Sequence, residues 1–329
     1  MYYKLKLKPI LNKMDTFPFR RDFVTLDHVK SLLQKLSQTH KQIITHKEPT
    51  EYHIRTNLHG SHLKFKTYRT DPGKFYTLSL QSNMYLSYGL LSDFFQEHVR
   101  ICARRNDDIS PLEYWEKNVE KITKEIESKV EQRDFIRQNV KECTQFHPEI
   151  MTAMIKFFHA KKILDFCAGW GDRLAACISM DDVIQKYTGI DANWSLFKGY
   201  EQMIKEYLPK HSRHKYEMIQ GDCIDILPKL NDMYDFIFTC PPYFDKEFYT
   251  DGKTDNDEQS ILKYTENWLK DFLINAIGLA YSLLAKNGHI IIAISGFEQE
   301  LVSQVSYLME YRGVIKCADL SLLVWCRRM

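Results

Sequence analysis

Residues 162–174 read Lys162-Ile163-Leu164-Asp165-Phe166-Cys167-Ala168-Gly169-Trp170-Gly171-Asp172-Arg173-Leu174: a short apolar strand, a turn with two glycines and the start of a helix. Gly169 and Gly171 let the backbone pass close to a ligand, because no side chain stands between. A helix that begins near Asp172 points its free amide groups at the same place. The third glycine of the dinucleotide-binding pattern is absent, since Arg173-Leu174 occupies its position. The segment therefore predicts a ligand-binding turn of a different kind.

Acidic residues end the next two predicted strands. The strand 186–191 ends in Asp191, 26 residues after Asp165, where a nucleoside-binding βαβ unit carries its ribose-binding acid. The strand 216–222 ends in Asp222, directly after Gly221. Solvated turns are the alternative explanation, but ligands of open α/β sheets bind at the carboxyl ends of strands. Three such ends in succession favour a binding site.

A proline-rich tetrapeptide, Cys240-Pro241-Pro242-Tyr243, follows the apolar strand 234–239. The two prolines fix the backbone, and they leave the Tyr243 ring in the cleft at the end of the strand. Such a tip can hold a flat, amine-bearing ring by its face and its edge. The alternative is a rigid turn from strand to loop that carries no chemistry.

From about Gln145 to Met329 the chain resembles the S-adenosylmethionine-dependent methyltransferases that modify exocyclic amines of nucleobases in DNA, including phage and giant-virus members. The glycine turn, the acids of the next two strands and the tetrapeptide match four family motifs in the right order. The resemblance implies an α/β fold with a Rossmann-like, seven-stranded methyltransferase sheet whose last strand is antiparallel. The segments 313–318 and 321–326 read as the closing pair of strands.

The resemblance also implies the role of each site residue. The glycine turn holds the methionine part of S-adenosylmethionine, Asp191 binds the ribose hydroxyls, and Asp222 contacts the adenine. The box Gln145-Phe146-His147-Pro148 helps to close the methionine end. The residues expected at the cofactor are Phe146, Pro148, Asp165, Phe166, Cys167, Ala168, Gly169, Gly171, Arg173, Asp191, Ala192, Asp222 and Cys223. Those expected at the target base are Cys240, Pro241, Pro242 and Tyr243, and no metal is expected.

Cys240 departs from the family pattern, which has Asp, Asn or Ser at this position. The lone pair of a ring amine is delocalised, so acceptors on the amine protons, including the Pro241 carbonyl, are needed to aim it at the methyl group. A thiol is a weaker acceptor than those side chains. Covalent attack of Cys240 on a pyrimidine ring is an alternative, but the family that uses it places the nucleophile after the proline. Adenine is the favoured target, and the amine of cytosine is the alternative.

The N-terminal region is basic. Residues 1–70 contain fourteen Lys or Arg and five Asp or Glu, a charge of +9 in a chain whose net charge is +2. Aromatic residues and histidines alternate with these cations, a mixture that suits phosphate contact and base stacking. An ordinary solvated surface is the alternative. We expect a DNA partner. The alternatives are a methyltransferase that acts on RNA or on nucleotides, and a catalytically weak nucleic-acid-binding protein that keeps the methyltransferase fold.

The chain divides into three predicted parts. Residues 1–110 form an α+β region that can recognise nucleic acid, residues 111–144 a helical connector, and residues 145–329 the methyltransferase domain. In the connector, Ser110 and Pro111 predict the start of one charged helix that runs to about Lys141. The polar loop 244–260 is a candidate flap over the target base.

The amino-acid composition indicates the cellular compartment in which the protein works. The eight cysteines are scattered without a Cys-x-x-Cys pair, which indicates reduced thiols in a cytosol, bacterial or that of a viral host. No apolar run is long enough to cross a bilayer, and the start is not a secretory signal. Six histidines between His28 and His62 are too irregularly spaced for a metal site. We expect a cytoplasmic protein with no membrane partner.

Overall fold

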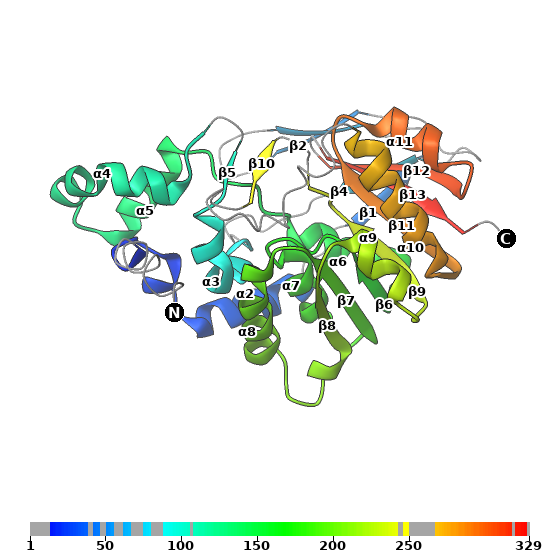
Figure 1. The fold of residues 1–329 in the computed structure, drawn as a ribbon, viewed down its shortest axis with the longest axis horizontal. Helices are drawn as coiled ribbons and strands as arrows, with labels where there is room; N and C mark the ends of the chain where they lie inside the picture. Colours follow the sequence, from blue (N-terminus) through cyan, green and yellow to red (C-terminus); the bar gives the residue numbers. More distant parts are fainter. Residues whose placement is uncertain are drawn as a thin grey trace.

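A nine-stranded sheet forms the centre of the molecule (Figure 1). The computed structural model describes residues 14–38, 42–46, 51–55, 62–66, 75–79, 88–105, 108–242, 246–249, 267–317 and 320–327. The strands in sheet order are β1 (Gln42–His46), β4 (Phe75–Ser79), β12 (Glu310–Cys317), β13 (Leu320–Cys326), β11 (Leu284–Ile294), β9 (Tyr234–Thr239), β6 (Lys162–Asp165), β7 (Lys186–Asp191) and β8 (Tyr216–Gln220).

The seven strands from β12 to β8 form the predicted Rossmann-like sheet. Strands β11, β9, β6, β7 and β8 run parallel to one another, whereas β13 is antiparallel to both β11 and β12. The last strand of the chain is therefore the antiparallel one, and the predicted fold class is confirmed. This arrangement brings the carboxyl ends of β6, β7, β8 and β9 to one edge.

The sheet is wider than the predicted seven strands. Strand β4 pairs in parallel with β12, and β1 pairs with β4 in the antiparallel sense. In a seven-stranded sheet, β12 would present an open edge of backbone N–H and C=O groups, a liability that proteins cover. Here β4 of the N-terminal region pairs with that edge, and β1 pairs with the far side of β4.

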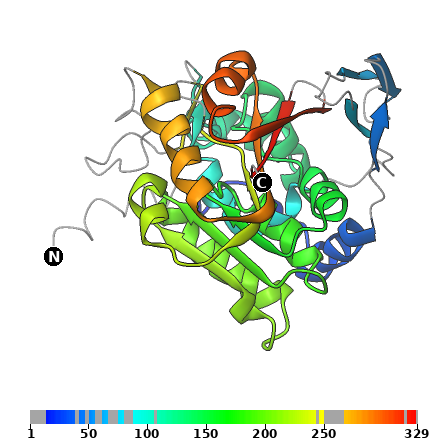
Figure 2. The same cartoon turned by 90° about the vertical axis from the view of Figure 1, so that its right-hand side faces the viewer.

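Helices cover both faces of the sheet. On one face lie α2 (Leu26–Gln38), α3 (Leu90–Arg100), α6 (Pro148–Phe158), α7 (Asp172–Ser179) and α8 (Phe197–Tyr207). On the other lie α9 (Cys223–Ile226), the π-helix η7 (Trp268–Ile274), α10 (Asn275–Ser282) and α11 (Glu298–Val305). Figure 2 shows the orange helices α10 and α11 on one side of the strands and the blue helix α2 on the other. Short 3-10 helices in the described ranges are η2 (Arg20–Asp22), η3 (Trp194–Leu196), η4 (Arg213–Lys215) and η5 (Leu227–Lys229).

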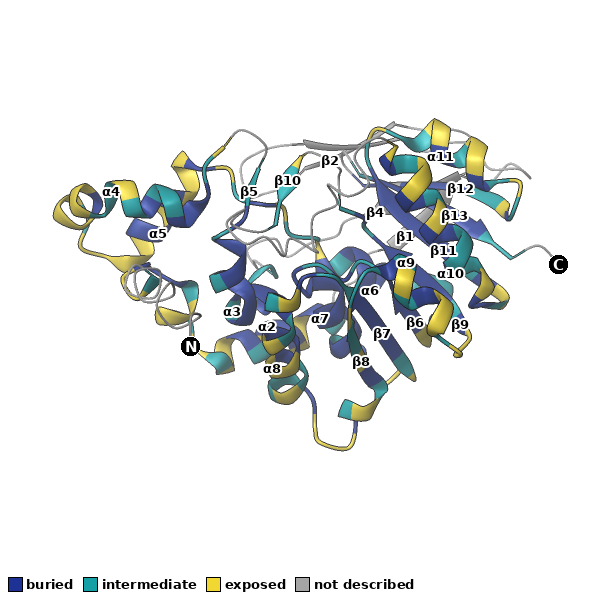
Figure 3. Cartoon of the chain, viewed as in Figure 1, coloured by how far each residue is buried: buried dark blue, intermediate teal, exposed yellow. Residues whose placement is uncertain are grey.

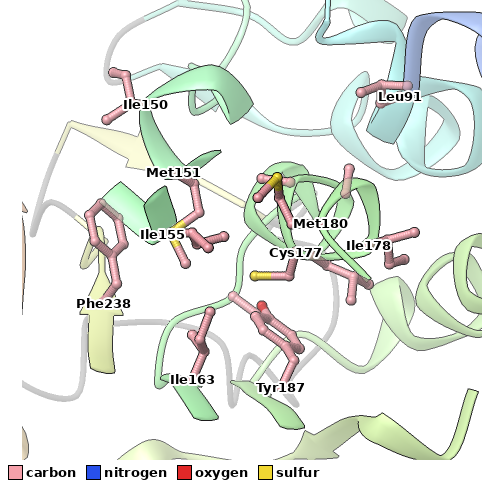
Figure 4. Close-up of a cluster of buried hydrophobic side chains, with 14 of the residues drawn as sticks. Leu91, Ile150, Met151, Ile155, Ile163, Cys177, Ile178, Met180, Tyr187 and Phe238 are labelled. Carbon is pink, nitrogen blue, oxygen red and sulfur yellow. The ribbon is translucent and has the colours of Figure 1, made fainter. Parts of the chain in front are cut away.

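Side chains of the central strands alternate between two hydrophobic cores. Ile291 and Ala293 of β11 belong to the core that includes α6 and α7, whereas Ile290 and Ile292 belong to the core of α10 and α11. This alternation follows from the two-residue period of a strand. Figure 4 shows the first core, where Ile163, Tyr187 and Phe238 of the sheet lie near Met151, Ile155 and Cys177 of α6 and α7. Strand β6, which leads into the glycine turn, thus has a buried hydrophobic core on each of its faces.

Helices of the N-terminal region share this first core. Val29 of α2 and Leu91 of α3 are buried in the same cluster as Leu174 of α7. Helices α2 and α3 therefore pack directly on the helix that follows the glycine turn. The division of the chain at residues 110 and 144 stays a prediction.

The connector contains two helices, so the prediction of one continuous helix is wrong. Helix α4 (Pro111–Glu125) begins as predicted, with the Ser110 Oγ accepting a hydrogen bond from the backbone N–H of Glu113 at 3.1 Å. It ends at Ile126, whose backbone is extended, and α5 (Lys129–Asn139) turns back. Their apolar stripes then meet in one cluster with Phe17, a burial that a straight helix would not allow. The outer surface of this hairpin is exposed (Figure 3).

Two small sheets complete the architecture: β2 (Glu51–Arg55) pairs with β3 (His62–Lys66), and β5 (Arg104–Arg105) pairs with β10 (Glu247–Phe248). Among the described residues, no helix is long and apolar enough to cross a membrane. The same part of the chain contains no group of three or more His, Cys, Asp or Glu side chains placed to hold a metal ion.

Candidate cofactor and catalytic site

The glycine turn and the ends of two strands meet through backbone and carboxylate contacts. The Gly169 N–H donates to the Asp191 carboxylate at 2.7 Å, and the Gly221 N–H donates to the Asp191 carbonyl at 3.0 Å. The Ala168 N–H donates to the Ile190 carbonyl at 2.9 Å. The structure therefore brings together the turn, Asp191 and the segment leading to Asp222, as the sequence predicts for one ligand edge.

The backbone of the turn needs both glycines. Gly169 has a φ of 63° and Gly171 a φ of 92°, in the left-handed region that other residues rarely adopt. A side-chain carbon added at Gly169 would meet no atom nearer than the Arg173 Nη2, at 3.9 Å. The space beside Gly169 is thus open, and a ligand can approach its backbone there. This opening fits the methionine part of a nucleoside cofactor.

Gly171→Ala is expected to destabilise the protein by about 1–2 kcal/mol, because a left-handed alanine is strained. The added carbon would also lie 3.0 Å from the Met203 sulfur. Gly278→Ala is the matched control, since nothing lies within 4 Å of its added carbon on α10. It should leave stability unchanged or raise it by about 0.5 kcal/mol, by lowering the entropy of the unfolded chain. Urea unfolding measures both; equal effects would contradict the account of the turn.

Asp165 lies under the turn in a fully buried polar cluster. Its carboxylate accepts hydrogen bonds from the Arg173 Nε at 2.7 Å and from the Tyr187 and Thr239 hydroxyls at 3.2 Å each. Arg173 also donates to the Cys167 carbonyl. Asp165 and Arg173 therefore position the turn from below, and Thr239 ties this cluster to the end of β9.

Asp191 combines burial with two backbone donors. Its second carboxylate oxygen accepts a hydrogen bond from the Asn193 N–H at 2.9 Å. Burial raises the pKa of Asp191 to about 6, although the N–H donors of Asn193 and Gly169 oppose this shift. At pH 7 and above the group is an anion whose remaining lone pairs can accept hydroxyl protons.

The other predicted cofactor residues differ in exposure. Asp222 is half-buried and caps α9, accepting the Ile224 N–H at 2.9 Å. Ala192 is half-buried beside Asp191. Phe166, Ala168 and Cys223 are buried in the two cores. These buried side chains support the edge from within.

The predicted box before α6 lies against the glycine turn. The Phe146 N–H donates to the carboxylate of Asp172, the first residue of α7, at 3.1 Å. The Phe146 ring lies 5.2 Å from the Arg173 guanidinium and 5.6 Å from the Phe238 ring centre. Pro148 is buried at the first position of α6. The structure thus places Phe146 beside the glycine turn, and its part in closing the methionine end stays a prediction.

Cys240 stands at the end of β9, the strand beside β6. It is half-buried, and burial raises the pKa of its thiol to about 11, with Arg173 acting in the opposite direction. The group is therefore a neutral thiol at pH 7, which disfavours covalent attack on a pyrimidine. Pro241 is buried and Pro242 is half-buried. Tyr243 lies outside the described residues, so its position stays a prediction.

The sequence did not identify a second wall of the site. Trp170 of the glycine turn packs edge-on against Tyr249, with ring centres 5.8 Å apart, and donates to the Thr144 carbonyl at 3.1 Å. The Glu247 carboxylate accepts from both the N–H and the hydroxyl of Thr144, each at 2.8 Å. Residues 246–249 of the predicted flap therefore contact the turn. No local pattern marks these contacts, which join residues between 26 and 103 positions apart in the chain.

A third contact joins α3 to the same place. The Ser92 hydroxyl donates to the Asp172 carboxylate at 2.5 Å, and the Gln145 amide donates to Ser92 at 3.0 Å. Burial raises the pKa of Asp172 to about 7, while the hydrogen bond from Ser92 lowers it. The N-terminal region thus helps to fix the box and the start of α7.

Comparison with known proteins gives structural likeness and no family match. The chain matches no family model and no curated protein. Three similar structures are TrmN of Thermus thermophilus (14% identity, TM-score 0.40, 55% of this chain and 49% of that chain), the O-methyltransferase TomG of Streptomyces achromogenes in complex with SAM (12%, 0.40, 60% and 86%) and the N-methyltransferase NodS of Bradyrhizobium japonicum with S-adenosyl-l-homocysteine (12%, 0.38, 55% and 87%). This chain spans about half the length of TrmN. The likenesses cover little more than half of this chain, and none of them assigns it an activity.

Proposed function

We propose that this chain transfers a methyl group from S-adenosylmethionine to the exocyclic amine of a nucleobase in DNA, with adenine as the favoured target. The observation that carries the proposal is the Gly169–Asp191 contact, which joins an open glycine turn to a carboxylate at the edge where β9 presents Cys240. A nucleoside held by that carboxylate lies on the same edge as the proline-rich tip.

Each residue of the edge has a part in holding the cofactor. Asp191 accepts the ribose hydroxyls, Asp222 contacts the adenine, and the backbone of Gly169 and Gly171 borders the methionine part, which Phe146 closes. When bound, S-adenosylmethionine supplies an electrophilic methyl group on a sulfonium. Asp165 and Arg173 keep the turn in register from below.

The tip after β9 orients the target amine. The Pro241 carbonyl and the Cys240 sulfur accept the two amine protons, so that the nitrogen lone pair points away from them. Proximity and alignment supply most of the rate in a direct displacement. A base swung out of a duplex, or presented by a single strand, reaches the tip and stacks on Tyr243.

Cys240→Ser is expected to methylate at least as fast as the natural protein, because a hydroxyl accepts a hydrogen bond better than a thiol. Cys240→Ala should be slower by about tenfold, from the loss of one hydrogen bond of about 1–1.5 kcal/mol. Initial rates at saturating cofactor measure both. A dead Cys240→Ser variant would instead indicate covalent catalysis by the thiol.

The direct test incubates the protein with methyl-labelled S-adenosylmethionine and matched DNA and RNA oligonucleotides, followed by nucleoside analysis. The proposal expects methylated adenine in DNA. Label on the cytosine amine or on RNA would mean that the substrate is different but that the reaction is still methyl transfer to a base amine. Saturable cofactor binding with no labelled nucleoside would leave a binding protein of this fold and would overturn the proposed activity.

A further inference from the structure

A cavity of about 520 Å³ opens beside the segment that leads into the cofactor box. Its wall includes Arg105 of β5, Arg137 of α5 and Lys141, and it reaches Cys143 and Gln145. Five of its twelve lining residues are Arg or Lys and two are Asp or Glu. The cavity is therefore positively charged and lies directly next to Phe146.

Three of these cations are available to an anion. Arg20 and Arg100 are held by Asp93, at 2.8 and 2.6 Å, so their charges are already compensated. Arg137 is exposed and lies 3.5 Å from Asp134, the kind of surface pair that contributes little.

Arg105 and Lys141 are the other two. The Arg105 Nε lies 3.8 Å from the Glu247 carboxylate, longer than a hydrogen bond. Lys141 is exposed, and within the described ranges it forms no ion pair of 4 Å or less. The dipole of α5 favours a cation in the last turn of that helix, which explains the presence of Arg137 there. It does not explain the presence of Arg105, which lies on a separate strand.

The cavity is connected to the catalytic tip by backbone pairing. Strand β5 pairs with β10, so that Arg105 lies opposite Glu247, seven residues after Cys240. Glu247 in turn holds Thr144 between the cavity residue Cys143 and the box. A polymer whose base occupies the tip has its neighbouring phosphates beside the tip, and this wall is a positively charged surface near Glu247.

Charge balance explains why such a surface is needed. Residues 145–329 contain 20 Lys or Arg and 25 Asp or Glu, so the methyltransferase part repels a polyanion. Affinity for nucleic acid depends mainly on cations that contact phosphates. We infer that Arg105, Arg137 and Lys141 bind the phosphodiester backbone of the substrate strand next to the target base. This inference rests on the proposed function and adds the place where the strand is held.

The test is fluorescence anisotropy of the full chain with a labelled DNA oligonucleotide at several salt concentrations. Arg137→Gln/Lys141→Gln removes two exposed cations of the cavity and should not disturb folding. We expect its Kd to rise about tenfold or more, and the slope of log Kd against log salt to fall by about 2, one for each phosphate contact. The control Lys121→Gln/Lys124→Gln removes the same charge from the exposed face of α4 and should change Kd by less than about twofold.

Equal losses in the two double variants, or none in the cavity variant, would overturn the inference. Calorimetry with S-adenosylmethionine should give the same affinity for the cavity variant as for the natural protein. DNA binding through the cavity without methyl transfer would refute the proposed function and leave this site standing. Methyl transfer to DNA, with a Kd for DNA that does not change in the Arg137→Gln/Lys141→Gln variant, would support the proposed function and refute this site. The same titration with an RNA oligonucleotide of matched sequence shows whether the cavity binds DNA or RNA more tightly.

Discussion

Asp191→Ala is expected to weaken S-adenosylmethionine binding by at least about 100-fold, because two hydrogen bonds from ribose hydroxyls to a carboxylate are lost, each worth about 1.5–3 kcal/mol. The change also leaves the Gly169 and Asn193 N–H groups without their acceptor. The turn therefore loosens at the same time as the ligand contact disappears. Isothermal titration calorimetry measures the loss directly.

Asp225→Ala is the matched control for this prediction. Asp225 is an exposed acid on α9, at the same edge of the sheet, and its substitution by alanine removes the same charge as Asp191→Ala does. Its cofactor affinity should stay within about twofold of the natural protein, since exposed charges are screened by solvent. If both variants bind the cofactor as the natural protein does, Asp191 is not the ribose acid.

Acid should weaken cofactor binding in the natural protein. Burial raises the pKa of Asp191 to about 6, so the carboxylate is charged above that pH and gains a proton below it. The protonated group loses acceptor capacity for the ribose hydroxyls. Affinity is therefore expected to be constant above about pH 7 and to fall as the pH drops through 6. A titration series between pH 5 and about 8 checks this, and affinity that rises on acidification would contradict it.

Arg173→Met is expected to destabilise the protein by about 3–5 kcal/mol, the largest effect on stability that we predict. Arg173 and Asp165 are 4% and 0% exposed, and their atoms lie 2.7 Å apart. Removing the guanidinium leaves a buried carboxylate whose charge no longer has a cation beside it. The Tyr187 and Thr239 hydroxyls remain but carry no charge. Urea unfolding gives the difference in the free energy of unfolding.

Two further variants make this prediction specific. Arg173→Met/Asp165→Asn removes both charges and should cost less than Arg173→Met alone, because no buried charge is left uncompensated. Lys186→Met breaks a more exposed pair with Asp232, 2.5 Å apart, and should cost less than about 1 kcal/mol. An Arg173→Met variant as stable as Lys186→Met would show that the buried pair does not support the turn.

Much of the sheet could be predicted from local sequence. The central strands contain apolar runs, Asp165 and Asp191 end β6 and β7, and Asp222 follows β8, so the parallel core and its ligand edge follow from pattern alone. The antiparallel closing pair followed from two short runs near the end of the chain. The sequence also placed Gly169 and Gly171 in a strand-to-helix turn, and both have a positive φ there.

Features that depend on distant contacts could not be predicted. Nothing in Phe75–Ser79 indicates that it pairs with β12, 235 residues later in the chain. The break at Ile126 is decided by the burial of two stripes against each other and not by a proline or glycine. The sequence placed both Asp165 and Arg173 among the ligand residues, but it did not predict the buried ion pair between them. The contact of Trp170 with Tyr249 is likewise set by tertiary packing.

The most direct measurement is a crystal structure of the protein with S-adenosylhomocysteine. We expect both ribose hydroxyls within hydrogen-bond distance, about 3 Å, of the Asp191 carboxylate, and a sulfur that faces the tip formed by Cys240 and Pro241. A ligand bound elsewhere, or a sulfur that faces away from that tip, would contradict it.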